Sequence, residues 1–178
     1  MRAFWALPIP CDVQERLAGA AREGAGLRAQ QPETIHLTLR FLGEISDPDR
    51  IAAAGGEVAG RHDPFALEIA GLGVFPHPRS ARVLWAGVGG GAEEATALAG
   101  DLEGALEPLG FRRERRPWHA HVTLGRFRRP RGIPPELLGS TDVFGRVRAE
   151  RIVLYRSTLT PGGAVHEPLL DLSLGRAT

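Results

Sequence analysis

The chain has 178 residues, a formal net charge of +1 and a single cysteine, Cys11. This length fits one domain or two small lobes that share a core, and one cysteine cannot form an internal disulfide or a cysteine-based metal site. All 22 basic residues are arginines, which excludes mechanisms that require a lysine, such as those of P-loop nucleotide hydrolases, pyridoxal enzymes and nucleotidyl-transferring ligases.

The sequence also lacks the signals of membrane and secreted proteins. No apolar run approaches the ~18 residues of a membrane span. The N-terminal stretch MRAFWALPIP has neither the long apolar region nor the cleavage site of a signal peptide. We therefore expect a cytoplasmic protein that does not use a membrane.

The first half of the chain is predicted to contain four strands and two helices. Apolar and β-branched residues indicate strands at residues 2–7, 34–42, 65–72 and 82–88. One helix is expected at residues 12–23, with Asp12 as N-cap. A second helix is expected at residues 47–60, weakened by Gly55 and Gly56.

The second half repeats this composition. Leucines at helical spacing predict a helix at residues 93–110, ended by Gly110. Strands are expected at about residues 119–127, 146–156 and 167–174. The turn-rich stretches are residues 73–82 and 87–92, and the second is predicted to join the halves. The expected fold is therefore α+β, with two similar lobes.

One short motif occurs in each half: HLTL at residues 36–39 and HVTL at residues 121–124. Because successive strand side chains point to opposite faces, each histidine shares a face with the threonine two positions later. Strict alternation also places Arg40 with His36 and Thr38, and Phe41 with the aliphatic residues on the core side. Each motif then holds two hydrogen-bonding side chains in fixed positions on one face of a strand, and two such strands can face each other across a groove.

Two imidazoles and two hydroxyls suit chemistry at a phosphodiester. One histidine can be a neutral base while the other is a protonated acid, because imidazole titrates near neutral pH. The hydroxyls can donate hydrogen bonds to the non-bridging phosphate oxygens, where charge must be held. This chemistry requires neither a metal nor ATP.

Arginines gather around the second motif. Eight of the 22 lie within residues 112–131. Guanidinium groups bind phosphate oxygens in a bidentate manner, so this cluster suits an anion or nucleic-acid surface, and a solvated face is the other interpretation.

Several segments resemble one known family. They are the paired HLTL and HVTL motifs, RFLGE after the first, FP and RVLWAGV before the second, the arginine after the second, and STLTPGG near the end. Together they resemble the bacterial and archaeal RNA 2',3'-cyclic phosphodiesterases, also called 2'-5' RNA ligases, of the two-histidine phosphoesterase superfamily. The resemblance covers nearly the whole chain.

This resemblance implies a bilobal fold with pseudo-twofold symmetry, formed by residues 1–178 as a single domain with the motif strands lining a central cleft. It also implies metal-independent opening of RNA 2',3'-cyclic phosphate ends to 2'-phosphomonoesters without a cofactor, and 2'-5' joining of RNA ends such as tRNA halves without ATP. When the motif residues of the family are matched to this sequence, His36 and His121 are the catalytic pair, with His36 assigned as general acid and His121 as general base. Exchanging these two roles leaves the sequence pattern unchanged. Thr38 and Thr123 hold the phosphate.

Three further residues are candidate substrate contacts. The family has an arginine at the position of Arg126, so we expect it to bind phosphate if Gly125 bends the strand to return it to the cleft. Arg40 could contact an RNA phosphate or form a charged rim. Phe41 could stack on a base, although a core position fits its strand parity better.

Some alternatives stay open at this point. His36, His119 and His121 could form a three-histidine zinc site, although the adjacent threonines favour acid–base work. His166 occupies a place where the family often has tyrosine, which leaves its contact with substrate undecided. The substrate could be a small cyclic nucleotide or another diester, or the chain could be a non-catalytic RNA-binding module. We expect a monomer, because the site is complete in one chain.

Overall fold

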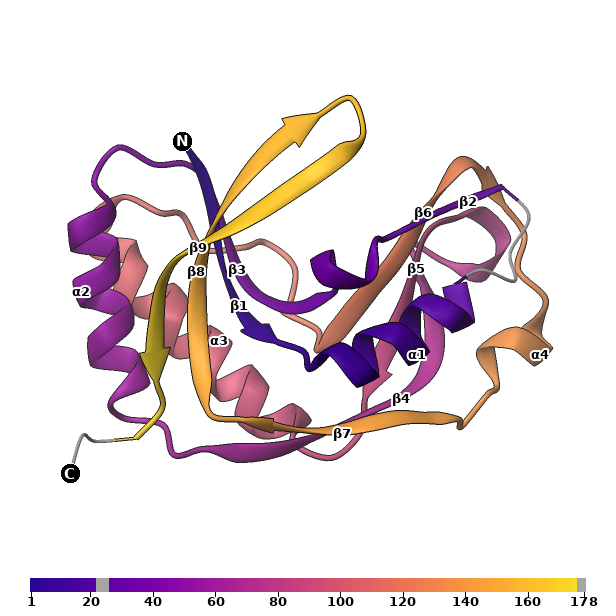
Figure 1. The fold of residues 1–178 in the computed structure, drawn as a ribbon, viewed down its shortest axis with the longest axis horizontal. Helices are drawn as coiled ribbons and strands as arrows, with labels where there is room; N and C mark the ends of the chain where they lie inside the picture. The colour runs from indigo at the N-terminus through magenta and orange to yellow at the C-terminus, as the bar shows by residue number, and fades with distance from the viewer. Residues whose placement is uncertain (22–25, 176–178) are drawn as a thin grey trace.

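The computed structural model describes residues 1–21 and 26–175, which form two antiparallel sheets with helices packed against them (Figure 1). The four-stranded sheet has the order β3-β1-β8-β9. Its strands are β1 (Arg2–Pro8), β3 (His36–Glu44), β8 (Arg151–Thr160) and β9 (Gly163–Ser173). The five-stranded sheet has the order β2-β6-β5-β4-β7. Its strands are β2 (Leu27–Ala29), β4 (Phe65–Phe75), β5 (Ala81–Val88), β6 (His121–Arg131) and β7 (Val143–Ala149).

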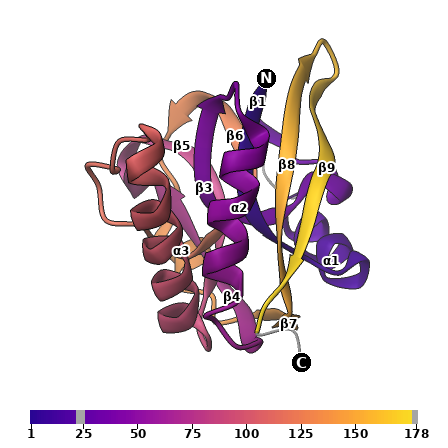
Figure 2. The same ribbon diagram turned by 90° about the vertical axis from the view of Figure 1, so that its left-hand side faces the viewer.

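Two of the helices pack against the sheet that does not contain the strand preceding them. Figure 2 shows α2 (Pro48–Ala59) and α3 (Ala92–Leu106) side by side. Although α3 follows β5 of the five-stranded sheet, it packs against β3 of the other sheet. Conversely, α1 (Cys11–Ala21) follows β1 of the four-stranded sheet and packs against β6 and β7. The remaining helical segments of the described chain are short: α4 (Pro135–Leu138) and the 3₁₀ turns Pro32–Thr34, Pro78–Ser80 and Glu107–Leu109.

One hydrophobic core joins both sheets. The aliphatic residues of the two motif strands, Leu37 and Leu39 in β3 and Val122 and Leu124 in β6, are all at most 1% exposed and belong to the same buried cluster. Burying such side chains is the main source of folding free energy, at roughly 25 cal/mol per Å² of apolar surface. The apolar side of each motif therefore fixes both strands to a common core.

Local sequence signals explain how α2 begins and why it contains glycine. The Asp47 carboxylate accepts a hydrogen bond from the Arg50 backbone N–H, and Pro48 stands at the first helical position. A Cβ at Gly55 would lie 2.4 Å from the Trp5 ring. The glycine that weakens this helix by propensity is therefore the residue that lets α2 approach β1.

The structure confirms the α+β fold and corrects several predicted boundaries. Residues 146–156 are not one strand, because β7 ends at Ala149 and β8 begins at Arg151 in the other sheet. The first helix begins at Cys11, so Asp12 lies in its first turn and pairs with Arg16 rather than capping it. Its predicted last two residues, 22 and 23, lie outside the described part of the chain. No helix among the described residues is long and apolar enough to cross a membrane.

Candidate active site

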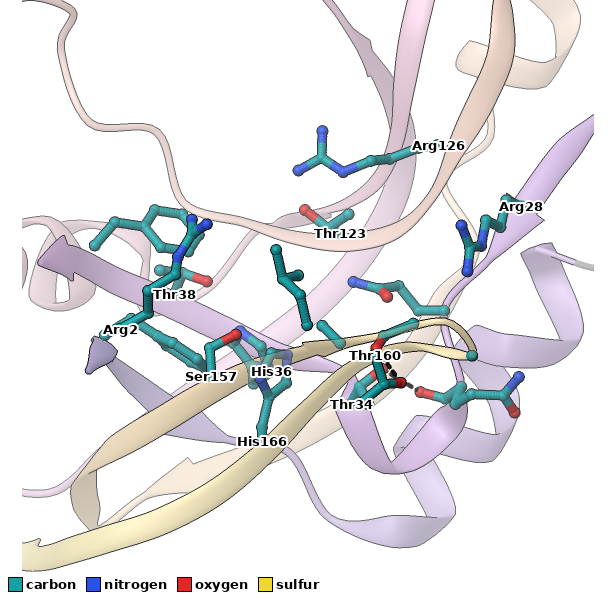
Figure 3. A pocket seen from close by; sticks show the side chains of 18 of the residues that line it. Arg2, Arg28, Thr34, His36, Thr38, Thr123, Arg126, Ser157, Thr160 and His166 are labelled. Carbon is teal, nitrogen blue, oxygen red and sulfur yellow. Dashed lines mark hydrogen bonds between the residues drawn. The ribbon is translucent and has the colours of Figure 1, made fainter. Parts of the chain in front are cut away.

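The two motif strands meet at a cavity of about 710 Å³. His36 and Thr38 from β3 line it together with Thr123 and Arg126 from β6 (Figure 3). His121 is not among the lining residues, but its register with β5 is unbroken through Thr123, so the two side chains share one face of β6. The structure thus brings the polar sides of both predicted motifs together.

A β-bulge follows the threonine of each motif. In β3, Ala6 pairs with Thr38 and Trp5 pairs with Arg40, which leaves Leu39 as an extra residue. In β6, Trp85 pairs with Thr123 and Leu84 pairs with Gly125, which leaves Leu124 extra. One extra residue reverses the alternation of faces beyond it. The same burial sequence over both motifs, with two buried residues in succession after the threonine, agrees with this.

The bulges correct the predicted faces of Arg40 and Phe41. Arg40 does not share the face of His36: it is 7% exposed and forms ion pairs with Glu103 (3.3 Å) and Glu114 (2.8 Å). Phe41 is not a core residue: it is 63% exposed and lines the cavity. Arg126, at the equivalent position of the second motif, also turns to the cavity. The bend that Arg126 requires is present, centred on Leu124 next to Gly125.

The first histidine lies in an aromatic setting. The His36 ring stacks on Phe4 at 4.7 Å between centroids and meets His166 edge-on at 5.3 Å. Burial, with a smaller contribution from His166, lowers the pKa of His36 from 6.5 to about 4, against an opposing hydrogen bond to the Thr34 backbone. His36 is therefore neutral at pH 7 in the free protein.

The second histidine has a matching arrangement. His121 Nδ1 donates a hydrogen bond to the carbonyl oxygen of His119 (2.7 Å), which leaves Nε2 of a neutral ring as a proton acceptor. The Phe75 ring meets His121 edge-on at 5.0 Å. Burial lowers the pKa of His121 against the opposing hydrogen bond to His119, and the nearby His119 ring and Arg126 charge lower it further. Both histidines are thus oriented by the backbone of the residue two positions earlier.

Two contacts tie the motif strands to each other. Trp118, which precedes β6, donates from Nε1 to the carbonyl oxygen of Thr38 (3.3 Å). Arg40 reaches from β3 to the same preceding segment, where it donates to the Arg112 carbonyl and pairs with Glu114. These contacts hold the segment leading into the second motif against the strand of the first.

The cavity lining carries positive charge without carboxylates. Its charged side chains are Arg2, Arg28 and Arg126, and no aspartate or glutamate is among the described residues that line it. The tip of the β8–β9 hairpin, residues 159–164, closes one side, and Figure 1 shows this hairpin leaning toward β2 and β6. A concave, wholly cationic lining favours an anionic ligand.

Sequence reasoning missed several lining residues. Arg28 lies on β2, a strand of three residues that is too short to show a period-2 pattern. Arg2 and Phe4 lie on the predicted first strand, where nothing marked them as functional. His166 does line the cavity, and its buried Nδ1 has no hydrogen-bond partner. The STLTPGG stretch, one of the segments that resemble the family, forms the end of β8 and the hairpin tip.

The three-histidine zinc site considered from the sequence does not form. Across residues 1–21 and 26–175, no three histidine, cysteine, aspartate or glutamate side chains are grouped so that they could hold a metal ion. His119 instead lies beside Trp85, with ring centroids 5.1 Å apart.

Comparisons with known proteins show the family and the fold. A family model described as the 2'-5' RNA ligase superfamily matches residues 9–159. A protein from Aeropyrum pernix named RNA 2',3'-cyclic phosphodiesterase is 37% identical over 85% of this chain and 89% of its own. The crystal structure of TT0787 from Thermus thermophilus covers 100% of both chains, with a TM-score of 0.85 and 30% identity. LigT from E. coli, crystallised with 3'-AMP, covers 97% of both chains, with a TM-score of 0.77 and 27% identity.

Proposed function

The chain belongs to the 2'-5' RNA ligase superfamily, and from this premise we propose that it opens RNA 2',3'-cyclic phosphate ends to 2'-phosphomonoesters. One observation carries the proposal: His36, Thr38 and Thr123 line one cavity whose charged lining is only cationic, and His121 shares the strand face of Thr123. The name of the Aeropyrum pernix relative, RNA 2',3'-cyclic phosphodiesterase, supports the same substrate.

The proposed reaction is an in-line displacement at phosphorus. His121 Nε2 takes a proton from water as its oxygen bonds to phosphorus, and the bond from phosphorus to the ribose 3' oxygen breaks. His36 gives a proton to that oxygen, which leaves as a hydroxyl, and the phosphate stays on the 2' oxygen. Thr38 and Thr123 donate hydrogen bonds to the non-bridging oxygens, and Arg126 offsets their negative charge. No metal or cofactor takes part in this scheme.

The assignment of the two roles is part of the proposal, and the charge of Arg126 beside His121 supports it. Arg126 disfavours the charged form of His121, which suits a base. His36 is neutral in the free protein because burial holds its pKa at about 4. To act as the acid it must gain a proton when the substrate's negative charge arrives beside it, because an adjacent anion raises the pKa of an imidazole.

Ligation would use the same displacement with a different nucleophile. If the 5' hydroxyl of another RNA end replaces water, the new bond joins its oxygen to the phosphorus and gives a 2'-5' linkage. The 3' oxygen leaves as before, so the step needs no ATP. We propose this as a side activity on RNA ends such as tRNA halves.

Replacing each histidine tests the proposed catalytic pair. We expect His36→Ala and His121→Ala each to lower kcat/KM on an RNA oligonucleotide with a 2',3'-cyclic phosphate end by at least about 100-fold, because each removes one proton-transfer group. The matched control is His77→Ala, since His77 is exposed and outside the cavity lining. Near-normal turnover by either active-site variant would exclude the pair.

A further inference from the structure

Arg28 stands directly opposite Arg126. Strand β2 pairs with β6 so that Leu27 faces Phe127, Arg28 faces Arg126 and Ala29 faces Gly125. Side chains that are directly opposite on antiparallel strands lie on the same face, with Cβ atoms about 5 Å apart. Both arginines line the cavity, and Figure 3 shows both side chains extending toward it.

The close approach of the β2 and β6 backbones holds the two arginines next to each other. A Cβ at Gly125 would lie 2.8 Å from the Arg28 carbonyl oxygen. Only glycine lets β2 lie this close to β6. The approach places Arg28 beside a residue of the same charge, an arrangement that destabilises a sheet unless something compensates for it.

Neither arginine has an acidic partner among the described residues. Two other exposed arginines do have one: Arg146 pairs with Glu68 (3.1 Å) and Arg156 pairs with Glu167 (2.5 Å). Two unpaired guanidinium groups in one concave site can each bind a separate phosphate in a bidentate manner. A ligand with more than one anionic group would give each arginine a charged partner.

Arg28 also faces the other wall of the cavity. Its Nη2 atom lies 3.7 Å from the position that a Cβ on Gly163 would occupy, at the tip of the β8–β9 hairpin. The lining at this end includes Gln30 and Thr160, whose side chains can also hydrogen-bond to a sugar or phosphate. The guanidinium group of Arg28 is thus set between β2 and the hairpin, away from the motif histidines.

We propose that Arg28 binds a second phosphate of the substrate, the phosphodiester that links the terminal nucleotide to the rest of the RNA. Arg126 binds the reacting cyclic phosphate, and Arg28 binds its neighbour in the chain. This assignment rests on the proposed function and extends it. The site then suits an oligonucleotide, because a nucleoside 2',3'-cyclic phosphate has no second phosphate for Arg28 to bind.

The test compares two substrates that differ by one adenosine and the phosphodiester that joins it. They are adenosine 2',3'-cyclic phosphate and the dinucleotide ApA with a 2',3'-cyclic phosphate end. We expect Arg28→Gln to lower the ratio of kcat/KM for the dinucleotide to kcat/KM for the mononucleotide by about 10-fold, the loss typical of one charge-assisted hydrogen bond. The matched control Arg61→Gln removes the same charge from an exposed position outside the cavity lining and should change the ratio less than about twofold.

A binding measurement separates this proposal from the proposed function. For an RNA oligonucleotide that already ends in a 2'-phosphate, the slope of log affinity against log salt should become shallower by about 0.7 in Arg28→Gln and stay unchanged in Arg61→Gln. If the wild-type protein hydrolyses neither cyclic substrate, the proposed function fails, and the binding data alone decide on Arg28. An unchanged salt slope in Arg28→Gln, or equal losses in both variants, would overturn the assignment. Arg28 is exposed, so its replacement leaves the folded structure intact.

Discussion

At the scale of single residues, the two motif histidines are oriented alike but differ in their charged surroundings. Each ring is hydrogen-bonded to the backbone of the residue two positions earlier and is packed against aromatic rings. Each also has a second histidine nearby, His166 beside His36 and His119 beside His121, and His121 has in addition the charge of Arg126. This difference makes distinct acid and base roles chemically reasonable for two groups that are identical in type.

The depressed pKa of His36 predicts a dependence of stability on pH. Between about pH 4 and pH 6.5 the unfolded chain binds a proton at this residue and the folded chain does not, so the free energy of unfolding rises with pH across this window. The shift from 6.5 to about 4 corresponds to as much as about 3 kcal/mol. The contribution is fully present above pH 6.5 and is lost as the pH falls toward 4.

Urea unfolding at pH 7 and at pH 4.5 measures this effect. We expect the stability difference between the two pH values to shrink in His36→Gln by about 2 kcal/mol, since glutamine has no proton to gain. His77→Gln, a change at an exposed histidine, should leave the difference unchanged. If His36→Gln retained the full pH dependence, the buried neutral state of His36 would be wrong.

Sequence reasoning placed the residues before the bulges correctly, and also Arg126, whose return to the cavity Gly125 indicated. His36, Thr38 and Thr123 reach the cavity because strand alternation holds over those positions. Arg40 and Phe41 exchange their expected faces because Leu39 adds one residue to the strand. A bulge depends on pairing with a distant strand, so the local sequence HLTLRF does not reveal it.

At the scale of elements, strand pairing decides what local patterns cannot. The stretch 146–156 has the pattern of one strand, yet β7 pairs with β4 and β8 pairs with β1 and β9. The change of sheet at Glu150 is a property of the tertiary structure. Strand β2 was missed for a related reason: its three residues gain order from β6 rather than from a pattern of their own.

The close approach of β2 to β6 predicts the effect of enlarging Gly125. Gly125→Ala should destabilise the protein by about 1–3 kcal/mol, because the new Cβ would lie within 3.0 Å of the β2 backbone and of Leu27. It should also weaken RNA binding by moving Arg28. The matched control is Gly19→Ala: Gly19 is an exposed residue of α1 with no atom within 4 Å of its Cβ position, and this change should raise stability by as much as about 1 kcal/mol.

Thermal unfolding and RNA-binding assays on the two variants give the comparison. A Gly125→Ala protein as stable as the wild type, with unchanged RNA affinity, would show that β2 tolerates displacement from β6. In that case the position of Arg28 would not depend on this contact.

At the scale of the whole molecule, the fold brings two similar half-sites together around one core. Helix α1 packs against the five-stranded sheet and α3 packs against β3 of the four-stranded sheet, so each half contacts the other. The aliphatic residues of both motifs are buried in the same cluster. Composition and motif spacing were enough to predict the α+β class and the pairing of the motifs. A groove between the motif strands was expected, but its full lining required the structure, because it comes from strands of both sheets.

The most direct test follows the phosphate through the reaction. An RNA oligonucleotide with a 2',3'-cyclic phosphate end is incubated with the protein in EDTA, and phosphorus NMR identifies which hydroxyl of the product carries the phosphate. We expect a 2'-phosphomonoester, formed at the same rate with and without EDTA. A 3'-phosphate product would reverse the leaving group, and loss of turnover in EDTA would contradict a reaction driven by His36 and His121 alone.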